Sequence, residues 1–217
     1  MDNPLQQTFF SMLAEYHTQI HPFPYLGSML GLMVIVLFLS PYPHKSRVSL
    51  LTLAFLWAWN GLVMFTYHFA ELYPVNYALQ GVLFPIQALL LSHAAFMKAP
   101  PEFDVASGVS GKAGLALMFT ALFLYPIIGN ITGHYYPAAP VFPDPCCLTI
   151  FTFGYLLSAR ARMPSGLIVV PFLWSLMGIV AVMKLGVMAD GLMVVVGIGC
   201  SVAILLKNRT ASRLQTA

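Results

Sequence analysis

Charged side chains are scarce in this chain. Lys, Arg, Asp and Glu together make up 8% of its 217 residues, whereas 59% of the residues are hydrophobic. Because a soluble domain carries about 25% charged residues, this composition excludes an ordinary soluble protein. The formal net charge of +3 comes from basic residues spread along the chain rather than clustered, so it gives no sign of nucleic-acid binding.

Several groups that particular chemistries need are also missing. Three cysteines are too few for a disulfide framework, and we expect no cleavable leader, because the start of the chain lacks a basic segment followed by an apolar run. The interiors of the apolar stretches hold no acidic or basic residue, which argues against a proton pump, a charge-moving transporter or a retinal-binding lysine. No opposed histidine pairs for haem and no nucleotide-binding motif are present.

What the sequence does contain is a series of long apolar stretches. A helix of about 20 apolar residues crosses a bilayer, and the stretches predict an all-α membrane protein with seven transmembrane helices. We place these helices at about residues 25–40, 48–69, 75–97, 113–128, 146–160, 166–183 and 187–206. The predicted parts are an interfacial segment over 1–24, the seven-helix domain over 25–206 and a cytoplasmic tail over 207–217.

The segment before the first transmembrane helix has its own pattern. Residues 4–21 predict a short amphipathic helix on the outer surface, because one stripe is apolar and the opposite face is polar. The stripe consists of Phe9, Leu13, Tyr16 and Ile20. Pro22 and Pro24 end this helix, since a residue that precedes proline is pushed out of the helical region.

The basic residues are distributed unevenly between the gaps. Only Lys184 lies on one side of the predicted membrane, and the other side holds Lys45, Arg47, Lys98, Lys112, Arg160, Arg162, Lys207, Arg209 and Arg213. Cytoplasmic loops retain Lys and Arg, so we expect the N-terminus outside, the C-terminus in the cytoplasm and the lipid bilayer as the main partner.

This topology brings imidazole, thiol and carboxylate groups to the outer face. Cys146 and Cys147 occupy the first turn of a predicted helix, where the helix dipole favours thiolate. Thiolates and imidazoles suit soft or borderline ions, so we predict a copper or zinc site with the ligands His68, His134, Cys146 and Cys147. Supporting side chains would be Glu71, Asp144 and Tyr135, and weaker candidate ligands are His17 and His21, four residues apart.

Four short segments of the chain resemble a known family. They are Leu-Trp-Ala-Trp-Asn-Gly at 56–61, Tyr-His at 67–68, Gly-His-Tyr-Tyr-Pro at 133–137 and Thr-Ile-Phe-Thr-Phe-Gly at 149–154. The family consists of small polytopic inner-membrane proteins of bacteria, known only as a domain of unknown function. The resemblance covers most of the chain and supports His68, His134 and Cys146 best. It implies a membrane fold and a bacterial inner-membrane location, and it implies no activity.

Three functions stay open on this basis. The first is binding or handling of the metal ion on the outer face. The second is a non-catalytic accessory or anchoring subunit of a larger redox or metalloenzyme complex, because Gly191, Gly197 and Gly199 would allow close helix packing. The third is a thiol-dependent membrane enzyme with Cys146 as nucleophile and His134 as base. Passive conduction of a neutral solute is a further alternative.

Overall fold

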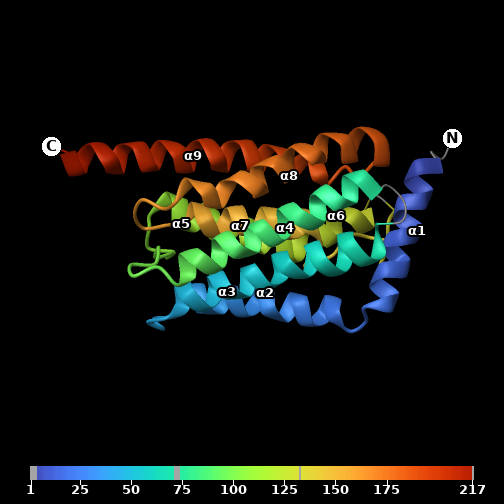
Figure 1. Cartoon of the computed structure of the whole chain (residues 1–217), viewed down its shortest axis with the longest axis horizontal. Helices are drawn as coiled ribbons and strands as arrows, with labels where there is room; N and C mark the ends of the chain where they lie inside the picture. The colour runs from blue at the N-terminus through green and yellow to red at the C-terminus, as the bar shows by residue number, and fades with distance from the viewer. Residues whose placement is uncertain (1–3, 71–73, 132, 217) are drawn as a thin grey trace.

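A computed structural model describes residues 4–70, 74–131 and 133–216 of the chain. These residues form helices without a strand, apart from one isolated bridge between Phe103 and Ala159. Most helices run side by side along the long axis of the molecule, whereas α1 (Pro4–Gln19) lies across one end of the bundle (Figure 1). The prediction of an all-α fold with a separate N-terminal helix is therefore confirmed.

The bundle is built from single helices and from continuous rods in which an α-helix passes directly into a π- or 3-10-helix. The single helices are α2 (Phe23–Leu39), α4 (Pro74–Ala95), α7 (Pro145–Leu157) and α9 (Asp190–Thr216). The rods are α3 with η1 (Lys45–Trp59, Asn60–His68), α5 with η2 and α6 (Val109–Phe119, Thr120–Leu124, Tyr125–Ile131), and η3 with α8 and η4 (Ser165–Ile168, Val169–Val180, Ala181–Leu185). The π-helical segments η1, η2 and η4 lie in the half of the bundle that α1 covers.

Length and composition mark a membrane protein. Four helical segments are long and apolar enough to cross a bilayer, namely Lys45–His68, Val109–Ile131, Ser165–Leu185 and Asp190–Ala211. Helices α1 and α2 reach that length only as a pair bent by 83°, and the apolar helices Leu79–Ala95 and Pro145–Leu157 are shorter. The described residues thus contain four or five candidate spans, and a count of seven stays a prediction.

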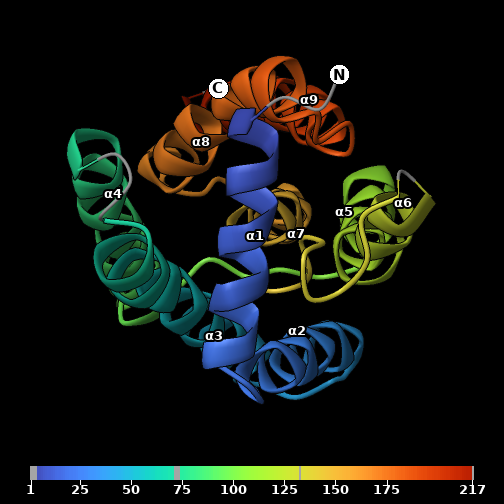
Figure 2. The same ribbon diagram turned by 90° about the vertical axis from the view of Figure 1, so that its right-hand side faces the viewer.

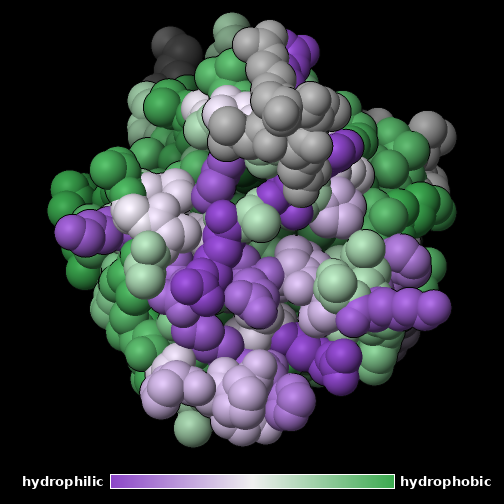
Figure 3. Space-filling model, turned by 90° about the vertical axis from the view of Figure 1, so that its left-hand side faces the viewer, coloured by the Kyte–Doolittle hydropathy of each residue, from purple (hydrophilic) through white to green (hydrophobic). Residues whose placement is uncertain are grey.

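The surface of the bundle has apolar sides and one polar end. Large apolar side chains are exposed along the helices, among them Met29, Leu32 and Val36 of α2, Leu79, Val82 and Leu89 of α4, and Val195, Ile198 and Val202 of α9. Exposed apolar surface of this extent suits lipid rather than water. At the end opposite α1, hydrophilic residues gather and apolar residues surround them (Figure 3). Ion pairs Lys45–Asp104 at 2.7 Å and Arg160–Glu102 at 3.3 Å lie at this end, where the sequence predicted the basic side.

Helix α7 is the centre of the bundle (Figure 2). Its residues from Cys147 to Leu157 are all buried. Helix α5 comes close at Gly154, where an added Cβ would lie 2.6 Å from the carbonyl oxygen of Gly114, so a larger residue would force the two helices apart. A helix of 13 residues is only about 20 Å long, and protein rather than lipid surrounds it on all sides.

The predicted glycine contacts of the last helix are only partly present. A Cβ on Gly197 would collide with Ser175 of α8, so this glycine does allow close approach. In contrast, a Cβ on Gly199 would meet nothing within 4 Å, and one on Gly191 would make an ordinary contact at 3.8 Å.

Candidate functional site

Helix α1 is fixed to the end of the bundle by one buried face. Phe10, Leu13, Tyr16 and His17 are buried, and Phe9 and Ile20 are partly buried against the core. The apolar stripe predicted from the sequence is therefore the docking face. The side chain of His17, which is not part of this stripe, is 0% exposed as well.

His17 is buried because it forms an ion pair with Asp144. Its Nε2 lies 3.1 Å from both carboxylate oxygens of Asp144, and its Nδ1 lies 2.6 Å from the carbonyl oxygen of Pro137. A carbonyl and a carboxylate only accept hydrogen bonds, so both ring nitrogens donate and the imidazole is protonated. Burial lowers the pKa of His17, but the charge of Asp144 and these hydrogen bonds raise it by more, leaving the pKa above its ordinary value.

The loop before α7 positions Asp144. Two carbonyls of this loop are tied to the bundle: Asn60 donates to the carbonyl of Pro143 at 2.9 Å, and Ser28 donates to that of Phe142 at 3.1 Å. The backbone N–H of Val141 donates to Asp144 at 2.9 Å. Asp144 is also the residue just before α7, whose first residue is Pro145. The ion pair therefore joins α1 directly to the central helix.

A second buried carboxylate lies at the start of α9. The hydroxyl of Tyr125 donates to one oxygen of Asp190, and the thiol of Cys146 donates to the other at a distance of 3.3 Å. Asp190 is 2% exposed. Because Cys146 donates its proton to a carboxylate, this geometry holds it as a thiol, whereas the helix start alone would favour thiolate. No histidine contributes to this cluster.

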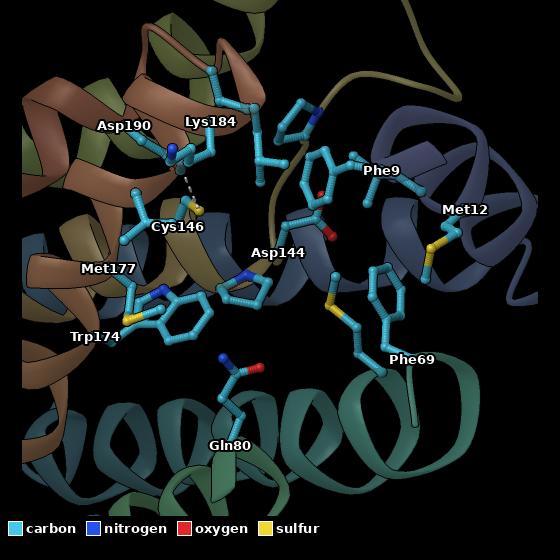
Figure 4. A pocket seen from close by; sticks show the side chains of 18 of the residues that line it. Phe9, Met12, Phe69, Gln80, Asp144, Cys146, Trp174, Met177, Lys184 and Asp190 are labelled. Atoms are coloured by element: carbon cyan, nitrogen blue, oxygen red, sulfur yellow. Dashed lines mark hydrogen bonds between the residues drawn. The ribbon is translucent and has the colours of Figure 1, made fainter. Parts of the chain in front are cut away.

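Between α1 and the ends of the rods lies a cavity of about 530 Å³. Its walls are mostly apolar and aromatic, and Figure 4 shows Phe9 and Met12 of α1 on one side and Trp174 and Met177 of α8 on the other. The polar residues that line it are Thr8, Gln80, Asp144, Cys146, Lys184 and Asp190. Both buried carboxylates thus border the same cavity. A volume of this size falls in the usual range for small-molecule sites, about 300–1,000 Å³.

The predicted metal ligands lie at this end of the molecule but not in one coordination sphere. His68 packs edge-on against Tyr16, with ring centroids 5.1 Å apart, and His134 stacks on Phe10 at 3.7 Å. Cys147 is 0% exposed within the core. In the part of the chain that the structure describes, no group of three or more His, Cys, Asp or Glu side chains is arranged to hold a metal ion.

The remaining candidates are placed as follows. Tyr135 is exposed, and His21 is an exposed residue whose ring lies 5.7 Å from that of Tyr25. Of these two histidines, His17 is buried in the bundle and His21 is exposed. Glu71 lies outside the described residues. Of the predicted set, the structure brings Asp144 and Cys146 to one cavity and leaves His68, His134 and Cys147 away from its lining.

Asp190, Trp174 and Gln80 line the cavity but are not among the predicted metal ligands. Asp190 had one available signal, since it is an acidic residue at the start of an apolar stretch, where burial is costly without partners. Trp174 and Gln80 look like ordinary residues of a transmembrane helix, and only the packing of α4 against α8 identifies them as lining residues.

Together, the fold and the site define a membrane-type helical bundle with a mostly apolar cavity beneath a transverse N-terminal helix. Comparison with protein families gives a family rather than a function: the chain belongs to the family described as "Family of unknown function (DUF6064)", whose model matches residues 6–215. The resemblance noted from the sequence is thus confirmed as membership of an uncharacterised family. Searches of curated proteins and of solved structures gave no match.

Proposed function

We propose that this protein is a seven-span integral membrane protein that binds a small apolar molecule in the cavity beneath α1. The apolar lining of that cavity carries the proposal. Its occupant would enter from the bilayer, because Met177 and Val180 line the cavity and are also exposed, at 40% and 47%, on the apolar side of α8. A membrane-soluble molecule can therefore reach the cavity without passing through water.

The count of seven adds α2, α4 and α7, which are too short alone, to the four long segments. All three run alongside longer neighbours in the bundle (Figure 1). Protein covers α7, so its short length exposes little backbone to lipid. The basic end would face the cytoplasm, and α1 would lie in the outer interface of a bacterial inner membrane.

Labelling of single cysteines tests this orientation. In a variant whose native cysteines are replaced by serine, Thr18→Cys on the exposed face of α1 and Arg162→Cys at the opposite end report the two sides. In intact spheroplasts, a membrane-impermeant maleimide should label the first variant and reach the second only after lysis. The reverse pattern would overturn the orientation.

Filling the cavity tests the binding function. Ala181→Phe places a ring in the cavity wall, whereas Met183→Phe changes a residue of the same helix that is 75% exposed and does not line the cavity. Protein released from membranes in mild detergent and measured by native mass spectrometry should carry a bound molecule in the wild type and in Met183→Phe. Ala181→Phe should lose it. Equal occupancy in all three proteins would refute binding at this site.

A soft metal ion is the second candidate, because sulfur atoms line the same cavity. The thiol of Cys146 and the thioethers of Met12, Met64, Met177 and Met193 border it, and Cu(I) prefers such donors. This proposal keeps Cys146 of the predicted ligands and replaces the histidines by methionines.

Copper analysis of protein purified without chelators distinguishes the two ligand sets. Cys146→Ser with Met193→Leu should lower the bound copper if the cavity holds the ion, whereas His68→Ala with His134→Ala should lower it if the set predicted from the sequence is correct. An absence of bound copper in the wild-type protein would refute both ligand sets.

A further inference from the structure

Two polar atoms of the cavity lining are buried without a hydrogen-bond partner. They are Nε1 of Trp174, a donor, and Oε1 of Gln80, an acceptor. Buried polar groups in folded proteins are nearly always paired, and leaving one unpaired costs about 1–3 kcal/mol. Both residues border the space in which a ligand would sit, and in Figure 4 Gln80 extends from α4 into the cavity that Trp174 borders from α8. A ligand that supplies their partners removes this cost.

The indole of Trp174 is held in place by other aromatic rings. Its ring centroid lies 5.4 Å from that of Phe65 and 5.1 Å from that of Phe84. This packing on α3–η1 and α4 prevents the N–H from turning away to another acceptor. The ligand must therefore bring an oxygen or another acceptor to a fixed point in an otherwise apolar wall.

Gln80 can pair with either a hydrogen-bond donor or an acceptor on the ligand. A half-turn of the amide exchanges its oxygen and its NH₂ group with almost no change of shape. The residue can thus accept a hydrogen bond from a hydroxyl or donate one to a carbonyl.

Both buried carboxylates of the cavity already have partners. The carboxylate of Asp144 is paired with the protonated His17, and Asp190 accepts hydrogen bonds from Tyr125 and Cys146. A charged ligand would therefore find no unsatisfied carboxylate to neutralise it, and burial of an unpaired charge is costly. The occupant is therefore expected to be neutral.

We propose that the occupant is a neutral ring compound with oxygen atoms on opposite sides of the ring, of the quinone and quinol class; this inference rests on the proposed binding function of the same cavity. Trp174 donates to one ring oxygen in both redox forms. Gln80 donates to the second oxygen of a quinone and accepts from the hydroxyl of a quinol. Aromatic and thioether side chains such as Phe9, Phe69 and Met177 pack against the ring, and an apolar tail extends past Met177 toward lipid.

Three probes test the ring class, two of which carry the same decyl tail. A short-chain benzoquinone with a decyl tail, decylbenzene and a phospholipid are added separately to the purified wild type, and the shift of the thermal unfolding midpoint is measured. The quinone should give the largest shift. If decylbenzene or the phospholipid shifts the midpoint equally, the ring class is wrong while apolar binding stands. If no probe shifts it, the proposed function fails as well.

Variants test the two hydrogen bonds. Trp174→Phe and Gln80→Leu should each weaken the Kd for the decyl quinone about tenfold, the usual effect of losing one buried hydrogen bond, and should leave decylbenzene binding nearly unchanged. Trp59→Phe is the matched control, since Trp59 lies outside the cavity lining. An unchanged quinone Kd in both cavity variants overturns the inference. If Trp174→Phe does not fold, Gln80→Leu and the comparison of the three probes still test the quinone inference.

Discussion

Removing the imidazole of His17 should release α1 from the bundle. The side chains of His17 and Asp144 are 0% and 6% exposed, so His17→Ala leaves a carboxylate buried with one remaining donor, the N–H of Val141 at 2.9 Å. Breaking a buried pair by removing one partner costs about 3–5 kcal/mol. We expect a loss of this size in the free energy of unfolding. His21→Ala is the control, because this exposed residue lies four positions further along and should change stability by less than about 0.5 kcal/mol.

The pH dependence gives the same prediction a second test. The pKa of His17 is raised in the folded protein, so the ion pair contributes fully below the unfolded pKa of about 6.5 and is lost as the pH rises through the higher folded pKa. The difference in stability between the wild type and His17→Ala should therefore shrink at alkaline pH.

Unfolding titrations in mild detergent at several pH values, together with limited proteolysis of α1, measure both effects. The double variant His17→Ala, Asp144→Ala should lose less than the sum of the single changes, because the two residues interact directly. A cost for His17→Ala no larger than that of His21→Ala, or one that grows with pH, would refute the account of this pair.

Three further changes test other parts of the structure. Gly154→Leu should lower the midpoint of thermal unfolding, since its Cβ would lie 2.6 Å from the Gly114 carbonyl oxygen and overpacking costs about 1–3 kcal/mol. Gly199→Ala is the control and should leave the midpoint unchanged, because its Cβ would meet nothing within 4 Å. Equal effects of the two changes would contradict the close approach of α5 and α7. The hydrogen bond from Lys45 lowers the pKa of Asp104. Asp104→Asn should therefore lower the free energy of unfolding by about 1 kcal/mol at neutral pH and leave it unchanged at a pH acid enough to protonate the wild-type carboxyl. A loss of stability that persists in acid would contradict this ion pair. In folded protein, a small maleimide should alkylate Cys146 of the Cys147→Ser variant but not Cys147 of the Cys146→Ser variant, because Cys147 is 0% exposed. Mass spectrometry shows which thiol reacts, and fast reaction of Cys147 would contradict the burial of α7.

Local patterns in the sequence predicted most of the fold. The helix over 4–21 follows from the pattern of neighbours along the chain and is present as α1. Lys45, Arg47 and Arg160, which the sequence placed on one side, line one pocket. The membrane assignment of the short helices stays a prediction, because α7 has only 13 residues and is shielded by protein.

The site depended on contacts that no local pattern contains. His17 and Asp144 lie 127 positions apart, and nothing near either residue shows that the two are paired. The sequence predicted that these residues gather at one end of the molecule, and their chemistry suggested a metal as their common partner, which stays a prediction. In the structure, the imidazole of His17 pairs with Asp144 and the thiol of Cys146 donates to Asp190.

Electron density in the cavity tests the central claim most directly. Crystals grown in a lipid mesophase, which keeps membrane-soluble molecules available, should show a flat density with an apolar tail between Trp174 and Gln80. Water molecules alone in the cavity, or a cavity closed by movement of α1 onto α8, would contradict the claim that it binds a molecule from the bilayer.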